Sequence, residues 1–223
     1  YPNWKPAAYQ KEQDPIRGVF AYVADGLLQP GEEAPAHQPQ LLPGQVKLKN
    51  INGDDKLNEE DMVLIGRNDP KFIFGFNNNF SYKNFDLNIY MYGQVGKIAG
   101  ANSYYDAWGS YGNRIKLGQN VPVSFKDAWS SDNQTSTRPS FIESAYGTGD
   151  LFLQKISFLR IRNITLGYTV PISKSICNRL RVYADINNPC VWTNWKGQDP
   201  ETDSNTNAYP NVTSFSIGVD ISF

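Results

Sequence analysis

The sequence predicts an all-β protein whose antiparallel strands are apolar on one side. Apolar and polar residues alternate with a period of two in several segments of about ten residues, the spacing of side chains along one face of a strand. Aromatic residues, which favour strands, make up 13% of the 223 residues. The segments between the alternating runs are rich in Gly, Asn, Asp, Ser and Pro, which favour turns and loops.

The first half of the chain contains one weak and two strong candidate strands. A weak strand is expected near 16–23. The segment 71–82 carries an aromatic face made of Phe72, Phe74, Phe76, Phe80 and Tyr82. The segment 85–95 has a matching apolar face made of Phe85, Leu87, Ile89 and Met91. Only Lys83 and Asn84 separate the two segments, so they are expected to form a tight β-hairpin.

Three further strands are expected at 152–170, 180–192 and 213–223. In the first of them the alternation changes phase near Arg162 and Asn163, which indicates either a β-bulge or a strand that starts at a different residue. Pro189 should limit the ladder at the end of the second, because proline has no amide hydrogen to donate. The last ten residues alternate without a break, with Phe215, Ile217, Val219, Ile221 and Phe223 on one face.

The connections alternate between long and short. The long, irregular segments are 25–70, 96–150 and 193–212, whereas those at 83–84 and about 171–179 are short. Membrane β-barrels have this asymmetry, with short periplasmic turns and long extracellular loops, so the three long segments are predicted to be extracellular. A soluble β-sandwich also has strands with one apolar face, and the pattern alone leaves both architectures open.

Composition excludes several classes of function. With 21 Lys and Arg against 22 Asp and Glu, the chain has no basic field to bind nucleic acid. One histidine, His37, and two cysteines leave no ingredients for a His-based catalytic triad or zinc site, so an enzyme is not expected. No apolar run is long enough for a transmembrane helix. The mean hydropathy of -0.50 does not exclude a barrel, because alternation averages out.

One loop resembles the calcium-binding loop of EF-hand or dockerin proteins. Oxygen ligands at the required spacing would come from Asn50, Asn52, Asp54, Lys56 through its backbone carbonyl, Asn58 and Asp61. Two features depart from that pattern: the first position is Asn rather than Asp, and Asp55 occupies the turn position that is usually Gly. The alternative is a metal-free turn held by Asn and Asp side chains. Calcium is the one cofactor that the sequence suggests.

Aromatic side chains in the long segments are candidates for ligand binding, because sugar rings stack on aromatic rings in binding cavities. The candidates are Tyr104, Tyr105, Trp108 and Trp195. The alternative is packing within loops or an aromatic girdle at a membrane interface, which suits Trp192 best.

Two pairs of charged residues are further candidates for a functional role. Arg160 and Arg162 lie opposite Leu159 and Ile161, so they are expected on the lumenal side of a barrel wall, where charge is tolerated. Asp199 and Glu201 resemble an acid/base pair in spacing, but in a loop they are expected to bind water or a partner in the loop.

The end of the chain and a series of blocks along it resemble a known family. Gly218, Ile221 and a C-terminal Phe223 resemble the signal by which bacterial outer-membrane barrels are recognised for assembly. Blocks that resemble the C-terminal part of SusC/RagA-family TonB-dependent transporters of Bacteroidetes occur in the family's order at 22–29, 44–54, 65–66, 68–71, 74–78, 80–87, 158–168, 171, 181–183, 196–201 and 209–210. This resemblance covers nearly all of residues 1–223 and favours the barrel over the sandwich.

The resemblance implies a role in transport. It implies that the chain supplies about six C-terminal strands of a 22-stranded transmembrane β-barrel in the Gram-negative outer membrane, with the plug domain and the N-terminal strands absent. It implies uptake of oligosaccharides or peptides, a SusD-like surface lipoprotein as partner, and coupling to TonB through the missing N-terminal part. The remaining partners would be the rest of the barrel and membrane lipids. The alternative function is a soluble carbohydrate- or calcium-binding β-sandwich module.

Overall fold

The computed structural model describes residues 17–100, 117–118, 120, 123–141, 147–172, 177–197, 199–202 and 209–223. The chain divides into two compact units. The first consists of Tyr1–Asp69, Ile98–Gln154 and Asp203–Thr206, and the second of Pro70–Lys97, Lys155–Thr202 and Asn207–Phe223. The described residues contain no helix with the length and hydrophobicity that crossing a membrane requires.

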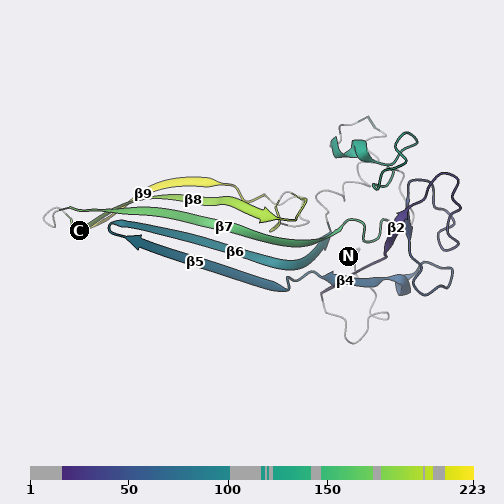
Figure 1. Cartoon of the computed structure of the whole chain (residues 1–223), viewed down its shortest axis with the longest axis horizontal. Coiled ribbons are helices and arrows are strands. Elements are labelled where there is room, and N and C mark those ends of the chain that lie inside the picture. The colour runs from purple at the N-terminus through teal and green to yellow at the C-terminus, as the bar shows by residue number, and fades with distance from the viewer. Residues whose placement is uncertain are drawn as a thin grey trace. The chain divides into compact units, whose positions relative to one another are not determined.

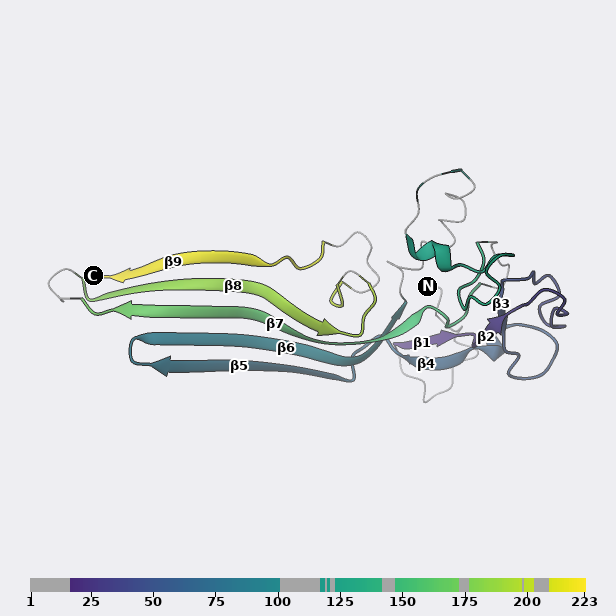
Figure 2. The same cartoon turned by 45° about the horizontal axis from the view of Figure 1, so that its top comes forward.

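The second unit contains a five-stranded antiparallel sheet, and the prediction of an all-β fold is confirmed. The strands of this sheet are β5 (Phe72–Tyr82), β6 (Phe85–Gly100), β7 (Leu153–Val170), β8 (Arg179–Thr193) and β9 (Ser214–Ser222). The residues of β6 after Lys97 and those of β7 before Lys155 belong to the first unit. They lie side by side in sequence order, as Figures 1 and 2 show. Each strand therefore pairs with its neighbour in the sequence, which is the simplest antiparallel topology.

The hairpin between β5 and β6 forms where the sequence predicts it. Tyr82 pairs with Phe85, so the turn consists of Lys83 and Asn84. Lys83 has a φ of 55°, a left-handed conformation that a tight hairpin turn requires. The register places Phe76 opposite Met91 and Phe80 opposite Leu87, so the apolar residues of the two strands share one face.

One face of the sheet is apolar, and its side chains remain exposed. The register continues this apolar face across the other strands, where Leu166, Ala184 and Ile217 lie in one row. Phe85 on β6 and Tyr168 on β7 have ring centroids 4.7 Å apart. This contact connects the apolar residues of the β5–β6 hairpin with those of β7, β8 and β9. Its exposed members include Phe72, Phe76, Phe80, Tyr82, Phe85, Leu166, Val182, Trp192, Phe215, Ile217, Val219 and Ile221.

The opposite face, called the polar face below, is rich in hydrogen bonds between side chains. The Asn88 amide group donates to Asn77 Oδ1 at 2.7 Å and to Asn79 Oδ1 at 2.6 Å, so it bridges two positions on the neighbouring strand. Asn163 donates in the same way to Asn187 at 3.1 Å. These polar residues alternate with the apolar ones along each strand, which explains why the mean hydropathy is low.

The predicted bulge lies between β7 and β8. Ile161 pairs with Cys190 and Asn163 with Asn187, so Arg162 alone lies opposite Asn188 and Pro189. Asn188 has a φ of 50°. The pairing of β8 with β9 ends at Asn187 and Ser214, so Pro189 does limit the ladder on that side, as predicted, although β8 continues beside β7 to Thr193.

The first unit contains short strands where the sequence predicts irregular loops. β1 (Gly18–Ala21) pairs antiparallel with β4 (Val63–Arg67), and β2 (Ala24–Leu27) with β3 (Val46–Leu48). Only β1 falls in a predicted strand. The expectation that 25–70 is irregular is therefore wrong in part, because strands of three to five residues are too short to show a period-two pattern. The 3-10 turns η2 (Glu59–Asp61) and η4 (Val123–Asp127) complete this unit.

A small core holds the first unit together. Leu27, Val46 and Leu48 from the β2–β3 pair pack with Trp129, and all four are buried. The fully buried Gln38 side chain accepts a hydrogen bond from the backbone amide of Leu48 at 2.7 Å. Its amide group in turn donates to the Val46 carbonyl at 3.5 Å, so it satisfies backbone groups that β3 would otherwise bury unpaired.

Candidate functional site

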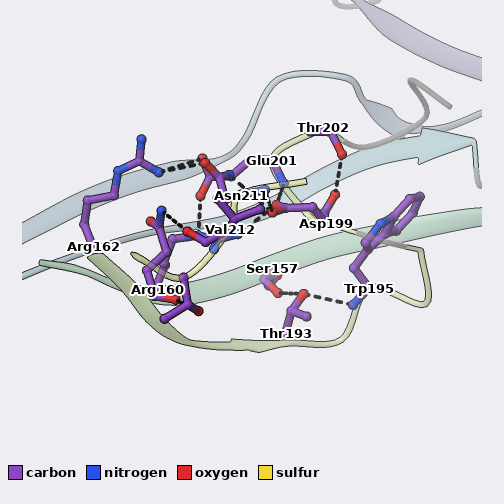
Figure 3. Close-up of polar contacts among 12 residues, drawn as sticks. Ser157, Arg160, Arg162, Thr193, Trp195, Asp199, Glu201, Thr202, Asn211 and Val212 are labelled. Atoms are coloured by element: carbon purple, nitrogen blue, oxygen red, sulfur yellow. Dashed lines mark hydrogen bonds and ion pairs between the residues drawn. The ribbon is translucent and has the colours of Figure 1, made fainter. Parts of the chain in front are cut away.

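The most organised polar site in the second unit is an ion cluster between β7 and the segment that connects β8 to β9. Arg160 lies on β7, is 2% exposed, and donates from Nη2 to Asp199 Oδ1 at 2.8 Å. Its Nε forms an ion pair with Glu201. Arg162, two residues along the strand, lies 3.6 Å from Glu201 Oε2. Figure 3 shows these side chains converging from the strand and the connecting segment.

Asp199 organises the connecting segment as well as binding Arg160. Its carboxylate accepts hydrogen bonds from the backbone amide of Glu201 at 2.9 Å, the backbone amide of Asn211 at 3.0 Å and the Asn211 side chain at 3.2 Å. A buried carboxylate with this many donors is stable as an anion. Asp199 therefore joins the two ends of the loop 199–211 and ties both to β7.

The environment of Asp199 lowers its pKa. Burial by itself raises the pKa of this carboxyl, but the backbone amides of Glu201 and Asn211, the Arg160 guanidinium and the Asn211 side chain together hold it below its ordinary value. A carboxyl with a lowered pKa in the folded state stabilises the fold above its unfolded pKa, and this stabilisation is lost as the pH falls through the folded value.

Acid is therefore expected to weaken this cluster only at pH values below about 4, the ordinary pKa range of aspartate. The measurement is the thermal midpoint of the full-length protein from pH 7 to pH 3, for the wild type and for Asp199→Asn. The variant should have a lower thermal midpoint than the wild type at pH 7, and its midpoint should fall by a smaller amount on acidification. An equal acid-dependent loss in both proteins would show that Asp199 does not carry this dependence.

A second ionic row crosses the polar face at the hairpin end of the sheet. Arg181 on β8 donates to both carboxylate oxygens of Asp86 on β6, at 3.0 and 2.6 Å. It also donates to Asp220 on β9 at 3.1 Å. Gly167 on β7 lies between these groups, and a Cβ there would come within 2.6 Å of Arg181 Nε. One arginine thus links three strands across a glycine that leaves room for it.

Gly218, a residue of the predicted assembly signal, has a packing role in the structure. It pairs with Tyr183 on β8, and a Cβ at 218 would lie 2.8 Å from Tyr183 Cε1 and closer still to Cζ. The tyrosine ring therefore covers the glycine. The guanidinium of Arg181 also lies over the Tyr183 ring, 5.0 Å from its centroid. Ile221 and Phe223, the other signal residues, are exposed. Recognition by an assembly machinery stays a prediction.

Replacing Gly218 with alanine is expected to destabilise the full-length protein by about 1–3 kcal/mol, because overpacking displaces the tyrosine ring. The matched control is Gly75→Ala in the same sheet, where the nearest atom to a new Cβ, Tyr90 Oη, is 3.7 Å away. Thermal unfolding in detergent should separate the two variants. Equal midpoints for both would contradict a packing role for Gly218.

The calcium-like loop is closed by hydrogen bonds to its own backbone. Asn50, Asn52, Asp54 and Asn58 each accept a backbone amide of a nearby residue at 2.5–3.1 Å. The fully buried Asp61 accepts the amides of Ile51 at 2.7 Å and Asn58 at 3.0 Å. Asp55 adopts a φ of 58°, as the loop pattern requires. These contacts are those of the Asn- and Asp-rich turn that the sequence offered as the alternative.

Calcium binding stays a prediction. Within the described residues, no three His, Cys, Asp or Glu side chains converge as metal ligands do. The calcium hypothesis expects heat on calorimetric titration of the full-length protein with calcium. It also expects weaker binding in Asp54→Asn, because each lost carboxylate reduces the attraction for the ion. Titration without heat would leave the metal-free turn as the explanation of this loop.

The predicted aromatic ligand-binding residues fall into two groups. Tyr104, Tyr105 and Trp108 lie outside the described residues. Trp195 is 6% exposed, so its ring does not form an open stacking surface in this structure. Its backbone amide donates to Thr193 Oγ1 at 3.0 Å, which fixes the chain just after β8. Trp192, by contrast, is exposed on the apolar face. Its place in an aromatic girdle stays a prediction.

The ion cluster is the feature that sequence reasoning did not assemble. The sequence places Arg160 and Arg162 on the polar side of a strand and Asp199 and Glu201 in a loop, but it does not pair them. One sequence signal could have suggested the pairing. The two arginines are separated by two positions on one strand, and the two carboxylates are separated by two positions in one loop. Glu201 also accepts a hydrogen bond from the Tyr92 hydroxyl on β6, a contact with no sequence signal.

Comparisons with known proteins agree on one family. No protein-family model matches the chain. It is 27% identical over 96% of its length to TonB-dependent receptor P3 of Formosa agariphila, covering 23% of that protein. It is 26% identical over 77% of its length to TonB-dependent receptor SusC of Bacteroides thetaiotaomicron, covering 17% of that protein. The chain thus spans about a fifth of the length of these curated relatives.

Solved structures show the same fold. The structure of the RagAB peptide transporter matches 92% of this chain with a TM-score of 0.70 at 22% identity, and the match covers 23% of that chain. The RagAB peptide importer in its open-open state matches with a TM-score of 0.68 at the same identity. The resemblance seen in the sequence is confirmed: the chain is homologous to part of the TonB-dependent receptors of the SusC/RagA family.

Proposed function

We propose that this chain forms part of the wall of a TonB-dependent importer in the outer membrane. The observation that carries the proposal is the exposed apolar face of the β5–β9 sheet. Ile217 is 83% exposed and Phe215 is 75% exposed, and Val219 and Ile221 on the same face of β9 are exposed as well. Soluble proteins rarely expose a continuous apolar surface of this kind, whereas the lipid-facing side of a membrane barrel requires one.

The same face argues against the soluble β-sandwich. In a sandwich, the apolar face of one sheet packs about 10 Å from that of a second sheet. In the described part of the second unit there is a single sheet, and its apolar residues are exposed to the surroundings. Lipid would cover these residues in the proposed barrel, and the polar face would line the lumen.

The remaining parts of the proposal follow from the relatives. The ligand would be a peptide or an oligosaccharide, a SusD-like lipoprotein would act as partner on the cell surface, and TonB would supply energy through a part of the protein outside this chain. The names of the relatives support two of these assignments: the TonB-dependent receptors support the coupling to TonB, and the RagAB peptide transporter supports a peptide ligand. The role of this chain would be to form the wall and bind ligand rather than to catalyse a reaction.

Cell fractionation tests the proposal. The native polypeptide should be found in the outer-membrane fraction, should require detergent for extraction, and should have a mass roughly four times that of this 25.1 kDa chain, as the 23% coverage of its relative suggests. A native protein of 25.1 kDa that is folded and monomeric without detergent would contradict it.

A further inference from the structure

We infer that Arg162 is a ligand-binding residue that contacts a carboxylate group of the transported ligand. The inference rests on the proposed function, which places the polar face of the sheet along the path of the ligand. It goes further by naming one residue and one chemical group.

The two arginines of the ion cluster differ in what their charges do. The Arg160 side chain is 3% exposed and its charge is matched at close range by Asp199 and Glu201. The Arg162 side chain is 42% exposed. A buried arginine paired with two carboxylates has a structural role, because removing its partners would leave an uncompensated charge. A half-exposed arginine beside that cluster is accessible to a ligand.

Most of the donors of Arg162 are uncommitted. Its Nη1 donates to Asn211 Oδ1 at 3.2 Å and lies 3.6 Å from Glu201 Oε2. That second distance exceeds the 2.7–2.9 Å typical of a charge-assisted hydrogen bond. Among the described residues, the structure records no partner for Nε or Nη2 of Arg162. Two adjacent nitrogens of a guanidinium are the geometry that binds a carboxylate through two hydrogen bonds.

The guanidinium is also held in position. Asn211, which accepts its hydrogen bond, is itself fixed by Asp199 through a backbone and a side-chain contact. Figure 3 shows the Arg162 side chain directed toward Asn211 and Glu201. Orientation before binding reduces the entropy that a ligand contact costs. The buried half of the cluster thus acts as the support for the exposed half.

A carboxylate fits this site better than a neutral group, because arginine offers only donors and carries a permanent charge. Peptides supply carboxylates at their C-termini and acidic side chains, and acidic oligosaccharides supply them on uronic acid rings. Both sources offer the same carboxylate chemistry, and binding measurements with peptides and with acidic oligosaccharides distinguish them.

The test uses the full-length protein, extracted from outer membranes and immobilised. It is offered a tryptic digest of casein and, separately, a partial hydrolysate of pectin, each in its native form and after methyl esterification of the carboxylates. Mass spectrometry measures the amounts retained by the wild type, Arg162→Gln and Arg162→Lys. In at least one native mixture the wild type should retain about tenfold more carboxylate-bearing species than Arg162→Gln, since a charge-assisted contact is worth a little more than 1.4 kcal/mol.

Arg162→Lys should fall between the two, because it keeps the charge but not the paired nitrogens. After esterification the three proteins should retain equal amounts. The mixture that shows the effect identifies the source of the carboxylate. Equal retention by the wild type and Arg162→Gln in both native mixtures, including no retention at all, overturns the inference.

Two controls keep the outcomes separate. Arg179→Gln removes an exposed arginine at the start of β8 and should retain the same species as the wild type. Thermal midpoints establish that each variant is folded. A protein that is absent from the outer membrane contradicts the proposed function. A protein that is present there, folded and indifferent to the change at Arg162 contradicts only this inference.

Discussion

Replacing Arg160 with alanine is expected to destabilise the full-length protein by about 3–5 kcal/mol, the usual cost of removing one partner from a buried ion pair. The reason is that Asp199, 4% exposed, would remain in place without its cation. The remaining donors, the amides of Glu201 and Asn211, would partly support its charge. The measurement is the free energy of unfolding in detergent or in lipid vesicles.

A double-mutant cycle isolates the pair. Arg160→Ala, Asp199→Ala and the double variant should show that the second change costs much less once the first is made, because residues in direct contact couple. Lys155→Ala serves as the control, because it removes an exposed cation from the same strand and should change stability by less than 0.5 kcal/mol, as is usual at exposed sites. Additive effects of the two cluster changes would contradict the proposed coupling.

Replacing Ile217 with arginine is expected to cost about 2–4 kcal/mol, the range for a cation on the lipid face near the centre of a membrane barrel. Ile217 lies near the middle of β9, in a row with Ala184 and Leu166. The expected result is a lower free energy of unfolding in lipid vesicles and less assembled protein in the outer membrane.

The matched control lies one residue away. Ser216 belongs to the polar face and pairs with Asp185, so Ser216→Arg places a cation beside an anion and in contact with water. It should change stability little, because charge on the lumenal side of a barrel is tolerated. Equal losses for the two variants would show that the two faces of β9 have the same surroundings and would contradict a lipid-facing side.

The sheet could be predicted from the sequence because its information is local. Alternation within β5, β6 and β9 is visible residue by residue, and the short turn at Lys83 and Asn84 joins two of these runs. The bulge at Arg162 was visible for the same reason, as a change of phase. A strand of nine or more residues contains enough repeats of the pattern to be recognised.

Other features depend on contacts between distant parts of the chain. Arg160 and Asp199 are 39 residues apart, and only folding shows that they meet. The pairing of β2 with β3 involves strands of four and three residues, which are too short to show an alternating pattern of apolar and polar residues. The burial of Trp195 follows from how the chain turns after β8, so a tryptophan that sequence reasoning offered as a ligand platform is buried instead.

The claim that one face of the β5–β9 sheet contacts lipid is tested most directly by a spin-label scan of β9. Single cysteines are introduced at 214–217 and 219–222 of the full-length protein, with Cys177 and Cys190 replaced by alanine, and the labelled proteins are reconstituted in lipid vesicles. Labels at Phe215, Ile217, Val219 and Ile221 should be accessible to oxygen, which dissolves in lipid. Labels at Ser214, Ser216, Asp220 and Ser222 should instead be accessible to a water-soluble nickel chelate. This period of two follows from the exposed apolar side chains and the register of β9. Equal accessibility of both sets to the nickel chelate would contradict the membrane assignment.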